Sequence, residues 1–486
     1  MNKNHSRFFA IICVFILSIS LNAQDDLPTD YLNKDFHAGR REALRKIMPD
    51  NSVMIVMAYP TRVFSNDVDY FYHQNPDMYY FSGYKEPHSI LLIFKEEQKA
   101  ADGSAYKEML FVQKKDPQAE QWTGRRLGVE GAKEKLGFAA AFNGEDFKNA
   151  QIDFSKFDKI IFDRFPDDVA NSGRNNADLA DLIEQFKTKA GITADFAKDK
   201  RYDTRLFRDL TGTLREIKTP EEMDLLRKAV EISCRGQNEV MKAVRPGMSE
   251  LEIQGLHEYV HKKYGAEEVG YGSIVGAGAN GCVLHYMENT KTKIGNEMLL
   301  MDVGAEYHGY TADVTRTIPA NGRFSEEQKI IYNLVYEAQE AAFKKLKDGA
   351  KWSDASKAAS DVIADGLLKL GIIKDRSESS IYYPHGLSHH IGLDVHDRGT
   401  YQTLKKDMVI TIEPGIYIPP NSKCDKRWWN IAVRIEDDAL ITENGYELLS
   451  AFAPRKVEEI EKMIAEKSAL DDFTVPKLKS AEKKAF

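Results

Sequence analysis

The first 205 residues alternate between short apolar runs and amphipathic stretches of helical period. The apolar runs are rich in β-branched residues and bounded by turn residues, which predicts strands at 50–57, 89–94 and 109–113. Helical patterns follow at 130–136 and 176–186. Strands that alternate with helices predict a smaller α/β domain, which we place at residues 25–205.

Signals for helix starts are clearest in the second unit, which begins near Leu214. Thr219-Pro220-Glu221-Glu222 combines an N-cap threonine, a proline at the first helical position and a glutamate three residues after the cap. Helices are predicted at 219–244, 249–264, 325–347 and 353–370, and strands at 298–303, 311–318, 408–412 and 431–435. Helices covering an antiparallel, hairpin-rich sheet predict an α+β domain at 214–455, followed by a terminal helix and charged tail at 456–486.

The N-terminus has the pattern of an export signal. Lys3 and Arg7 precede the apolar run 8–21, which leads to the small residue Ala23. This run is short for a membrane span and predicts a signal peptide at residues 1–23. We therefore expect an exported protein, periplasmic or secreted, with no stable membrane insertion after cleavage. The formal net charge of -8, without a long basic run, argues against nucleic acid as a partner.

Four of the 12 histidines fall within residues 385–397. Imidazole is the side chain best suited to hold a metal or move protons near neutral pH, and such a cluster is rarely needed for packing alone. The glycines Gly386 and Gly392 argue against a continuous helix and favour a strand-loop segment. A single histidine here is more often structural than a ligand, so the hypothesis depends on what else meets this segment.

Four strands of the second unit carry an acidic residue inside or at the end of an apolar run. These residues are Asp302, Asp313, Glu413 and Glu436. Ionised carboxylates leave water only when they are paired or bound to metal, and two divalent cations would neutralise four of them. With one imidazole added, the ligand set is rich in oxygen and free of thiolate, which favours manganese, cobalt or zinc. The pattern therefore points toward a hydrolase.

The order and context of these residues resemble the five-ligand signature of the pita-bread metallopeptidases. Asp302 and Asp313 are followed by His389 in His-Gly-Leu-Ser-His, Glu413 in Thr-Ile-Glu-Pro-Gly and Glu436 in Val-Arg-Ile-Glu-Asp-Asp. The nearest resemblance is to the Xaa-Pro aminopeptidase (aminopeptidase P) branch, whose first domain is echoed by residues 72–84 and 122–126. This resemblance implies an α+β pita-bread (creatinase/aminopeptidase) catalytic domain preceded by the smaller α/β domain.

The resemblance also assigns roles to individual residues. It implies that Asp302, Asp313, His389, Glu413 and Glu436 bind two divalent metal ions, Mn²⁺ first, with Co²⁺ or Zn²⁺ as alternatives. It implies catalytic roles in substrate contact and proton movement for His285, His385, His396, Glu413 and Arg434. Thr315, two residues from Asp313, is expected to support the ligands from outside.

The implied reaction is release of the N-terminal residue from peptides with proline in the second position, by attack of a metal-bridging hydroxide. A prolidase acting on Xaa-Pro dipeptides shares the fold and ligands and is the enzymatic alternative. A non-catalytic peptide-binding member of the fold is less favoured, because all five ligand positions are filled. By analogy with the family, a homo-oligomer is expected.

Three further local features of the sequence bear on function. Residues 276–281 fit G-x-G-x-x-G, but residues 282–286 are expected to continue as a strand, so the helix that a dinucleotide phosphate needs is absent. The pair His390-Ile391 and Asn430 depart from the usual family pattern. Because they touch no expected ligand, they are expected to reshape the substrate pocket rather than to abolish hydrolysis.

Overall fold

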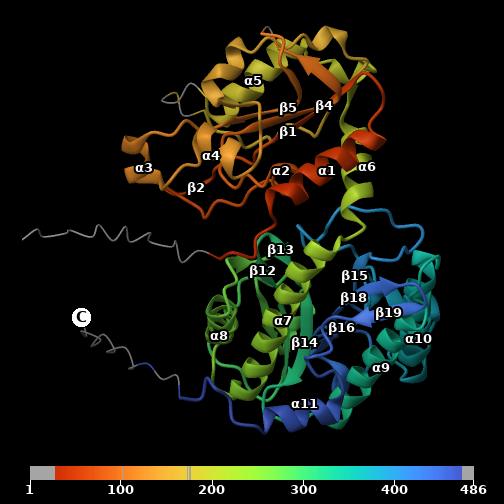
Figure 1. The fold of residues 1–486 in the computed structure, drawn as a ribbon. Helices are drawn as coiled ribbons and strands as arrows, with labels where there is room; N and C mark the ends of the chain where they lie inside the picture. The colour runs from red at the N-terminus through yellow and green to blue at the C-terminus, as the bar shows by residue number, and fades with distance from the viewer. Residues whose placement is uncertain (1–27, 101, 172, 174–176, 473–474, 476–486) are drawn as a thin grey trace, which may run out of the picture. The chain divides into compact units, whose positions relative to one another are not determined.

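The computed structural model describes residues 28–100, 102–171, 173, 177–472 and 475 (Figure 1). The expected signal peptide and most of the charged tail lie outside these residues. From Leu32 onward the described residues pack as one compact unit, so the boundary proposed between the two domains stays a prediction. No helix in the described ranges is both long and apolar enough to cross a membrane.

The N-terminal part is built on a six-stranded sheet of order β6-β5-β4-β1-β7-β8. The pairs β1/β4 and β4/β5 are antiparallel, whereas β1/β7, β5/β6 and β7/β8 are parallel. The strands are β1 Ser52–Met57, β4 Ile90–Lys99, β5 Ala105–Val112, β6 Ala141–Asn143, β7 Lys159–Phe162 and β8 Tyr202–Asp203, with a separate hairpin of β2 Val63–Ser65 and β3 Val68–Asp69.

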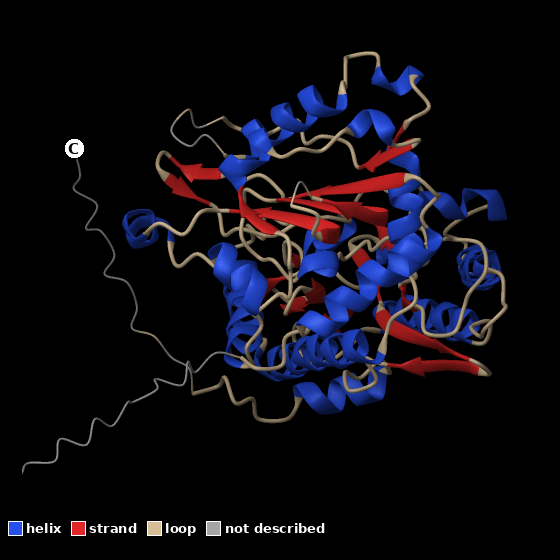
Figure 2. Ribbon diagram, turned by 45° about the horizontal axis from the view of Figure 1, so that its top comes forward, coloured by secondary structure: helices blue, strands red, loops and turns tan. Residues whose placement is uncertain are grey.

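Helices cover both faces of this sheet (Figures 1 and 2). Val53 and Ile55 pack in a core with α5, whereas Met54 and Val56 point to the other core, which α1 and α2 complete. Successive side chains of a strand point to opposite faces, so a strand buried on both sides reads as a continuous apolar run. The helices are α1 Lys34–Ile47, α2 Pro76–Ser82, α3 Pro117–Thr123, α4 Gly128–Glu134, α5 Leu179–Ala190 and α6 Thr204–Arg215.

The C-terminal part consists of small antiparallel sheets. Their strand orders are β10-β11-β14, β13-β12-β9, β15-β18-β19 and β16-β17. The strands are β9 Glu268–Val269, β10 Ile274–Ala277, β11 Met298–Val303, β12 Ala305–Tyr307, β13 Tyr310–Thr311, β14 Val314–Pro319, β15 Val409–Ile412, β16 Gly415–Ile418, β17 Ile431–Arg434, β18 Asp437–Thr442 and β19 Gly445–Leu448. The predicted α+β class is confirmed.

Helices pack against these strands from two sides (Figure 1). Helix α7 contacts β12, β13 and β14, α8 contacts β9 and β10, and α9 contacts β15, β16 and β17. The helices are α7 Pro220–Ala243, α8 Glu250–Lys263, α9 Glu326–Phe343, α10 Trp352–Lys369 and α11 Val457–Ile464. The predicted capping box of α7 is present, because Thr219 N donates to Glu222 Oε2 at 2.9 Å and Glu222 N to Thr219 Oγ1 at 3.4 Å.

Two strand predictions need correction. The predicted strand at 311–318 is interrupted at Ala312 and Asp313, since the amide of Asp313 donates to the Asp438 carboxylate at 3.1 Å rather than to a strand. The expected strand at 282–286 is wrong. The short 3-10 helix Gly278–Cys282 and a turn lie there, next to the buried Glu250 carboxylate, which accepts from Ala277 N at 2.8 Å. The α-helix that a phosphate would need is absent from this place as expected.

A buried pair of histidines on α8 makes the fold sensitive to acid. Burial lowers the pKa of His261 to about 4 and that of His257 well below its usual range. Neither ring nitrogen of His261 has a hydrogen-bond partner among the described residues, and His257 Nδ1 has none either. Both rings are therefore buried in the neutral form.

We expect the free energy of unfolding to fall as the pH drops from about 6.5 toward 4. In this window the unfolded state binds protons that the folded state rejects, which costs about 1.4 kcal/mol per pH unit for each histidine. His261→Phe should flatten this slope, as measured by urea unfolding at pH 7 and pH 5. Tyr259→Phe on the same helix is the control and should keep the wild-type slope. Equal slopes in all three proteins would contradict the assignment.

Candidate metal centre and active site

One pocket gathers every residue that the sequence singled out for chemistry. Together with the solvent at its mouth it encloses about 1030 Å³. Its wall includes the five expected ligands Asp302, Asp313, His389, Glu413 and Glu436 and the other expected catalytic residues His285, His385, His396 and Arg434. Residues up to 151 positions apart in the chain therefore converge on one point, from His285 to Glu436.

The acidic residues converge because each lies at a strand or strand end of adjoining sheets. Asp302 belongs to β11 and faces Thr315 of β14 in the antiparallel register, and Asp313 precedes β14 directly. Glu413 follows β15 and Glu436 follows β17. His389 is tied to the same place, because the amide of Thr411 in β15 donates to its carbonyl at 2.9 Å.

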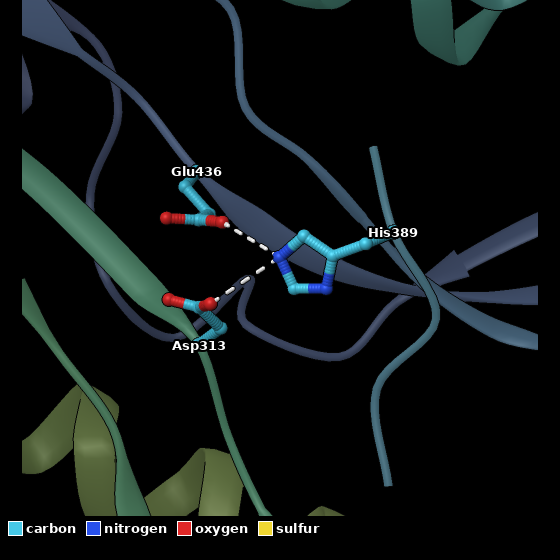
Figure 3. A group of neighbouring side chains, drawn as sticks. All are labelled: Asp313, His389 and Glu436. Carbon is cyan, nitrogen blue, oxygen red and sulfur yellow. Dashed lines mark ion pairs between the residues drawn. The ribbon is translucent and has the colours of Figure 1, made fainter. Parts of the chain in front are cut away.

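The His389 ring points toward the carboxylates of Asp313 and Glu436 (Figure 3). Its Nδ1 lies 2.9 Å from the carbonyl oxygen of His390, and because a carbonyl only accepts, Nδ1 carries the proton. In the neutral ring Nε2 is then the acceptor atom, and it lies 3.5 Å from Asp313 Oδ2, 3.5 Å from Glu413 Oε1 and 4.0 Å from Glu436 Oε1.

A cation, either a proton or a metal ion, must lie between this nitrogen and the carboxylate oxygens. One ligand atom from each of Asp313, His389 and Glu436 lies within 4.8 Å of the others, which suits a shared metal ion. The donor set contains oxygen and imidazole nitrogen without thiolate, as divalent metals such as manganese, cobalt or zinc accept. The residues present therefore fit divalent metal ions.

The electrostatics of the pocket lead to the same conclusion. Burial raises the pKa of Asp313, Glu413 and Glu436 well above their usual range, and neighbouring carboxylates raise it further. Burial also raises the pKa of Asp302, but the positive charge of Arg434 outweighs this and keeps it low. One guanidinium cannot balance four carboxylates, so two divalent cations are needed to keep the whole set ionised.

Two tyrosines bond to this cluster that the sequence reasoning missed. Tyr271 Oη lies 2.6 Å from Asp302 Oδ1 and 2.5 Å from Asp313 Oδ1. Tyr417 Oη accepts from Arg434 at 2.8 Å and lies 2.9 Å from His385 Nε2, to which it donates. Tyr417 lies on β16, four residues after Glu413, and this closeness in the sequence could have indicated that it belongs to the site. Tyr271 lies in a loop without any periodic pattern, so the sequence gives no such indication for it.

The expected supporting contacts are present as well. Thr315 Oγ1 donates to Glu436 Oε2 at 2.6 Å, as its position two residues from Asp313 suggested. Arg434 Nη2 donates to Asp302 Oδ2. Hydrogen bonds of this kind fix the orientation of ligand carboxylates before a metal arrives.

The remaining histidines lie around the carboxylates. Burial and then the charge of Arg434 lower the pKa of His385 to about 4, and its Nδ1 lies 3.7 Å from Glu413 Oε2. Burial and then His389 lower the pKa of His396, whose ring stacks edge-on against that of His389 at 4.3 Å between centroids. His285 is exposed at the pocket wall, where an incoming peptide can reach it.

The two departures from the family pattern do not form this pocket. His390 is fully buried, stacks with Trp352 at 4.9 Å and bonds the Thr400 carbonyl through Nε2 at 2.8 Å. Asn430 adopts a left-handed conformation with φ of 63°, which asparagine tolerates better than most residues. Neither residue is part of the pocket wall, so their effect on the substrate pocket stays a prediction.

Comparisons with known proteins agree with this geometry. Residues 37–159 match the family described as aminopeptidase P, N-terminal domain, and residues 224–443 match metallopeptidase family M24. The chain is 35% identical to the Xaa-Pro aminopeptidase of Escherichia coli (strain K12) over 441 residues, which covers 87% of this chain and 96% of that protein.

Solved structures show the same fold. The structure of the Pseudomonas aeruginosa aminopeptidase PepP superposes with a TM-score of 0.78 at 35% identity, over 90% of this chain and 98% of that one. Aminopeptidase P from E. coli with the inhibitor Pro-Leu gives a TM-score of 0.77 at 32% identity, over 89% and 98% of the two chains.

Proposed function

Because this chain belongs to the aminopeptidase P branch of metallopeptidase family M24, we propose that it is an exported enzyme that uses manganese to release the N-terminal residue from peptides with proline in the second position. Its general activity is that of a metal-dependent Xaa-Pro aminopeptidase. The observation that carries the proposal is the convergence of all five ligand residues, with the His389 lone pair 3.5 Å from two carboxylates.

Each side chain of the pocket has a part in this reaction. Asp302, Asp313, His389, Glu413 and Glu436 would hold two divalent ions. When bound, such ions polarise the scissile carbonyl and lower the pKa of a water molecule, which supplies the nucleophile.

Proton transfer and substrate orientation belong to the chain itself. Glu413 faces both His389 and His385, and we assign it the transfer of a proton toward the leaving proline nitrogen. His385 is held by Tyr417, so its ring keeps a fixed orientation toward the peptide. His285 and His396 line the same wall, and we assign them contact with the peptide and its positioning.

Selectivity for proline follows from the missing backbone N–H of the second residue of the peptide. An Xaa-Pro bond has no backbone N–H and carries a rigid ring. A pocket built around that ring rejects other peptides by shape and by leaving their N–H unpaired after burial.

The alternatives are less well supported. The relatives at 30% identity or more include several Xaa-Pro aminopeptidases, which favours an aminopeptidase over a prolidase. A purely binding role is disfavoured because no ligand position has been lost.

Three parts of the proposal have separate grounds: the identity of the metal, the export of the protein and its oligomeric state. Manganese suits the oxygen-rich donor set, and export rests on the charge and apolar pattern of residues 1–23. We propose a homo-oligomer by analogy with the family.

Hydrolysis of three peptides tests the proposed function. Purified protein should cleave Ala-Pro-Ala after chelation and readdition of manganese, with little action on Gly-Pro or Ala-Ala-Ala. Cleavage of Gly-Pro alone would make the protein a prolidase. Failure to cleave any of the three in the presence of manganese, cobalt or zinc would leave peptide binding as the function.

His396→Ala is expected to lower turnover about 100-fold while metal content stays near normal. The reason is that His396 contacts His389 and the pocket but lies outside the expected ligand set. Metal analysis of the purified variant beside kcat for Ala-Pro-Ala checks this. Loss of metal together with activity would show that His396 supports the ligands instead.

A further inference from the structure

A second pocket lies at the end of the small sheet β13-β12-β9 that is farther from the carboxylates. Together with the solvent at its mouth it encloses about 570 Å³. Its wall combines residues of the N-terminal part with residues of the catalytic part. They are Phe71, Tyr72, His73, Gln74, Pro76, Tyr79, Lys85, Glu267, Glu306, His308, Gly309 and Leu393.

Four chain segments run from the active-site pocket to this second pocket. Each segment contributes one residue to the wall of the active-site pocket. A second residue of the same segment, two to four positions away in the sequence, belongs to the wall of the second pocket. The pairs are Asp302 and Glu306, Asp313 and Gly309, Tyr271 and Glu267, and Val395 and Leu393. Three of these segments are paired in one sheet, and the fourth is attached to it by a bond from Thr311 N to the Gly392 carbonyl at 2.9 Å.

The spacing of the two pockets matches the length of a short peptide. Four residues of extended chain span at most about 13 Å, which bounds the distance from Asp302 to Glu306. An extended substrate advances by about the same amount per residue. The second pocket is thus within reach of the third or fourth residue beyond a bond cleaved at the carboxylates.

Only the leaving side of the substrate can reach that far. An aminopeptidase has a single residue before the scissile bond, so any more distant contact belongs to residues after it. The geometry points to the second pocket as a subsite for positions 4 and 5 of the peptide, which deepens the proposed function and rests on it.

The lining of the second pocket selects an apolar side chain. Phe71, Tyr72, Pro76, Tyr79 and Leu393 form its apolar walls. Phe71 is 70% exposed, so a peptide side chain can reach it.

The acidic groups of the second pocket are already engaged. His73 Nε2 lies 2.8 Å from Glu306 Oε2, and Lys85 Nζ lies 3.0 Å from Glu267 Oε1. Because these carboxylates already have cationic partners, the apolar walls suit phenylalanine or leucine better than a charged side chain.

The test compares peptides that differ only at positions 4 and 5. Wild-type protein with manganese should cleave Ala-Pro-Ala-Phe-Ala or Ala-Pro-Ala-Ala-Phe with kcat/KM about tenfold above Ala-Pro-Ala-Ala-Ala, the gain expected from covering one aromatic side chain. Phe71→Ala should remove most of this preference and leave kcat/KM for Ala-Pro-Ala unchanged.

Phe64→Ala is the matched control, because Phe64 is 63% exposed in the same region but is not part of the pocket wall. It should keep the wild-type preference. Equal rates for the three pentapeptides in wild type, or a uniform loss for all substrates in Phe71→Ala, would overturn the subsite. A Phe71→Ala variant that keeps the peptide preference but changes its oligomeric state would also overturn the subsite. That result would mean that a second copy of the chain covers the pocket. Inactivity toward Ala-Pro-Ala would instead overturn the proposed function, and the subsite with it.

Discussion

Asp302→Ala is expected to abolish peptide hydrolysis and divalent-metal binding together. Asp302 is one of the five residues expected to hold the ions, and it bonds both Tyr271 and Arg434. Loss of an outer hydrogen-bond partner of a ligand costs about 10- to 100-fold in metal affinity, so loss of the ligand itself should cost at least as much. Metal content after dialysis and kcat/KM for Ala-Pro-Ala measure the two effects.

Asp302→Asn separates metal binding from folding. The amide keeps the shape of the carboxyl group but removes its charge, so it should also lose metal while melting close to the wild type. Asp437→Asn is the matched control, because Asp437 is also buried and bonded to an arginine, Arg316, but is not part of the pocket wall. Full activity of Asp302→Ala would overturn the assignment of this residue as a ligand.

The ligand residues could be predicted because each breaks a local rule. An acidic residue inside an apolar strand pattern is conspicuous, as Asp302 after residues 298–301 shows. The capping box at Thr219 was equally readable, since its four residues are consecutive. Signals of this kind are local, and the structure places these residues as expected.

Contacts between distant residues left no such signal. Tyr271 bonds two carboxylates 31 and 42 residues away, and nothing in its own surroundings in the sequence indicates this. The expected strand at 282–286 failed for a related reason, because the buried Glu250 carboxylate 27 residues earlier fixes the turn through Ala277. Burial of a charge depends on partners that only the fold supplies.

The buried ion cluster around Arg215 is the largest feature that sequence reasoning could not reach. Arg215 is 1% exposed and donates to Asp77 Oδ1 at 2.8 Å, Asp394 Oδ2 at 2.9 Å and Asp397 Oδ1. Asp77 is 138 residues away and Asp397 182 residues away. The cluster ties α2 of the N-terminal part to the segment that carries His396.

The charge state of this cluster is set by its partners. Burial raises the pKa of Asp397, but Arg215 and Lys218 outweigh burial and bring it to about 2. A carboxyl group whose folded pKa is depressed stabilises the fold above its unfolded pKa. This contribution is therefore present at neutral pH and is lost only as the pH falls toward 2.

Arg215→Met is expected to lower the free energy of unfolding by about 3–5 kcal/mol, because it leaves buried carboxylates short of a partner. Urea unfolding measures this, and Arg205→Met on the same helix is the control. The Arg205 side chain is 92% exposed and pairs with Asp209 at 3.7 Å, so its loss should cost about 0–1 kcal/mol. Because Asp394 and Asp397 flank His396, kcat for Ala-Pro-Ala should also fall in Arg215→Met at temperatures where the variant is fully folded. Unfolding midpoints that coincide for the two variants would show that Lys218 and Arg398 suffice to neutralise the cluster without Arg215.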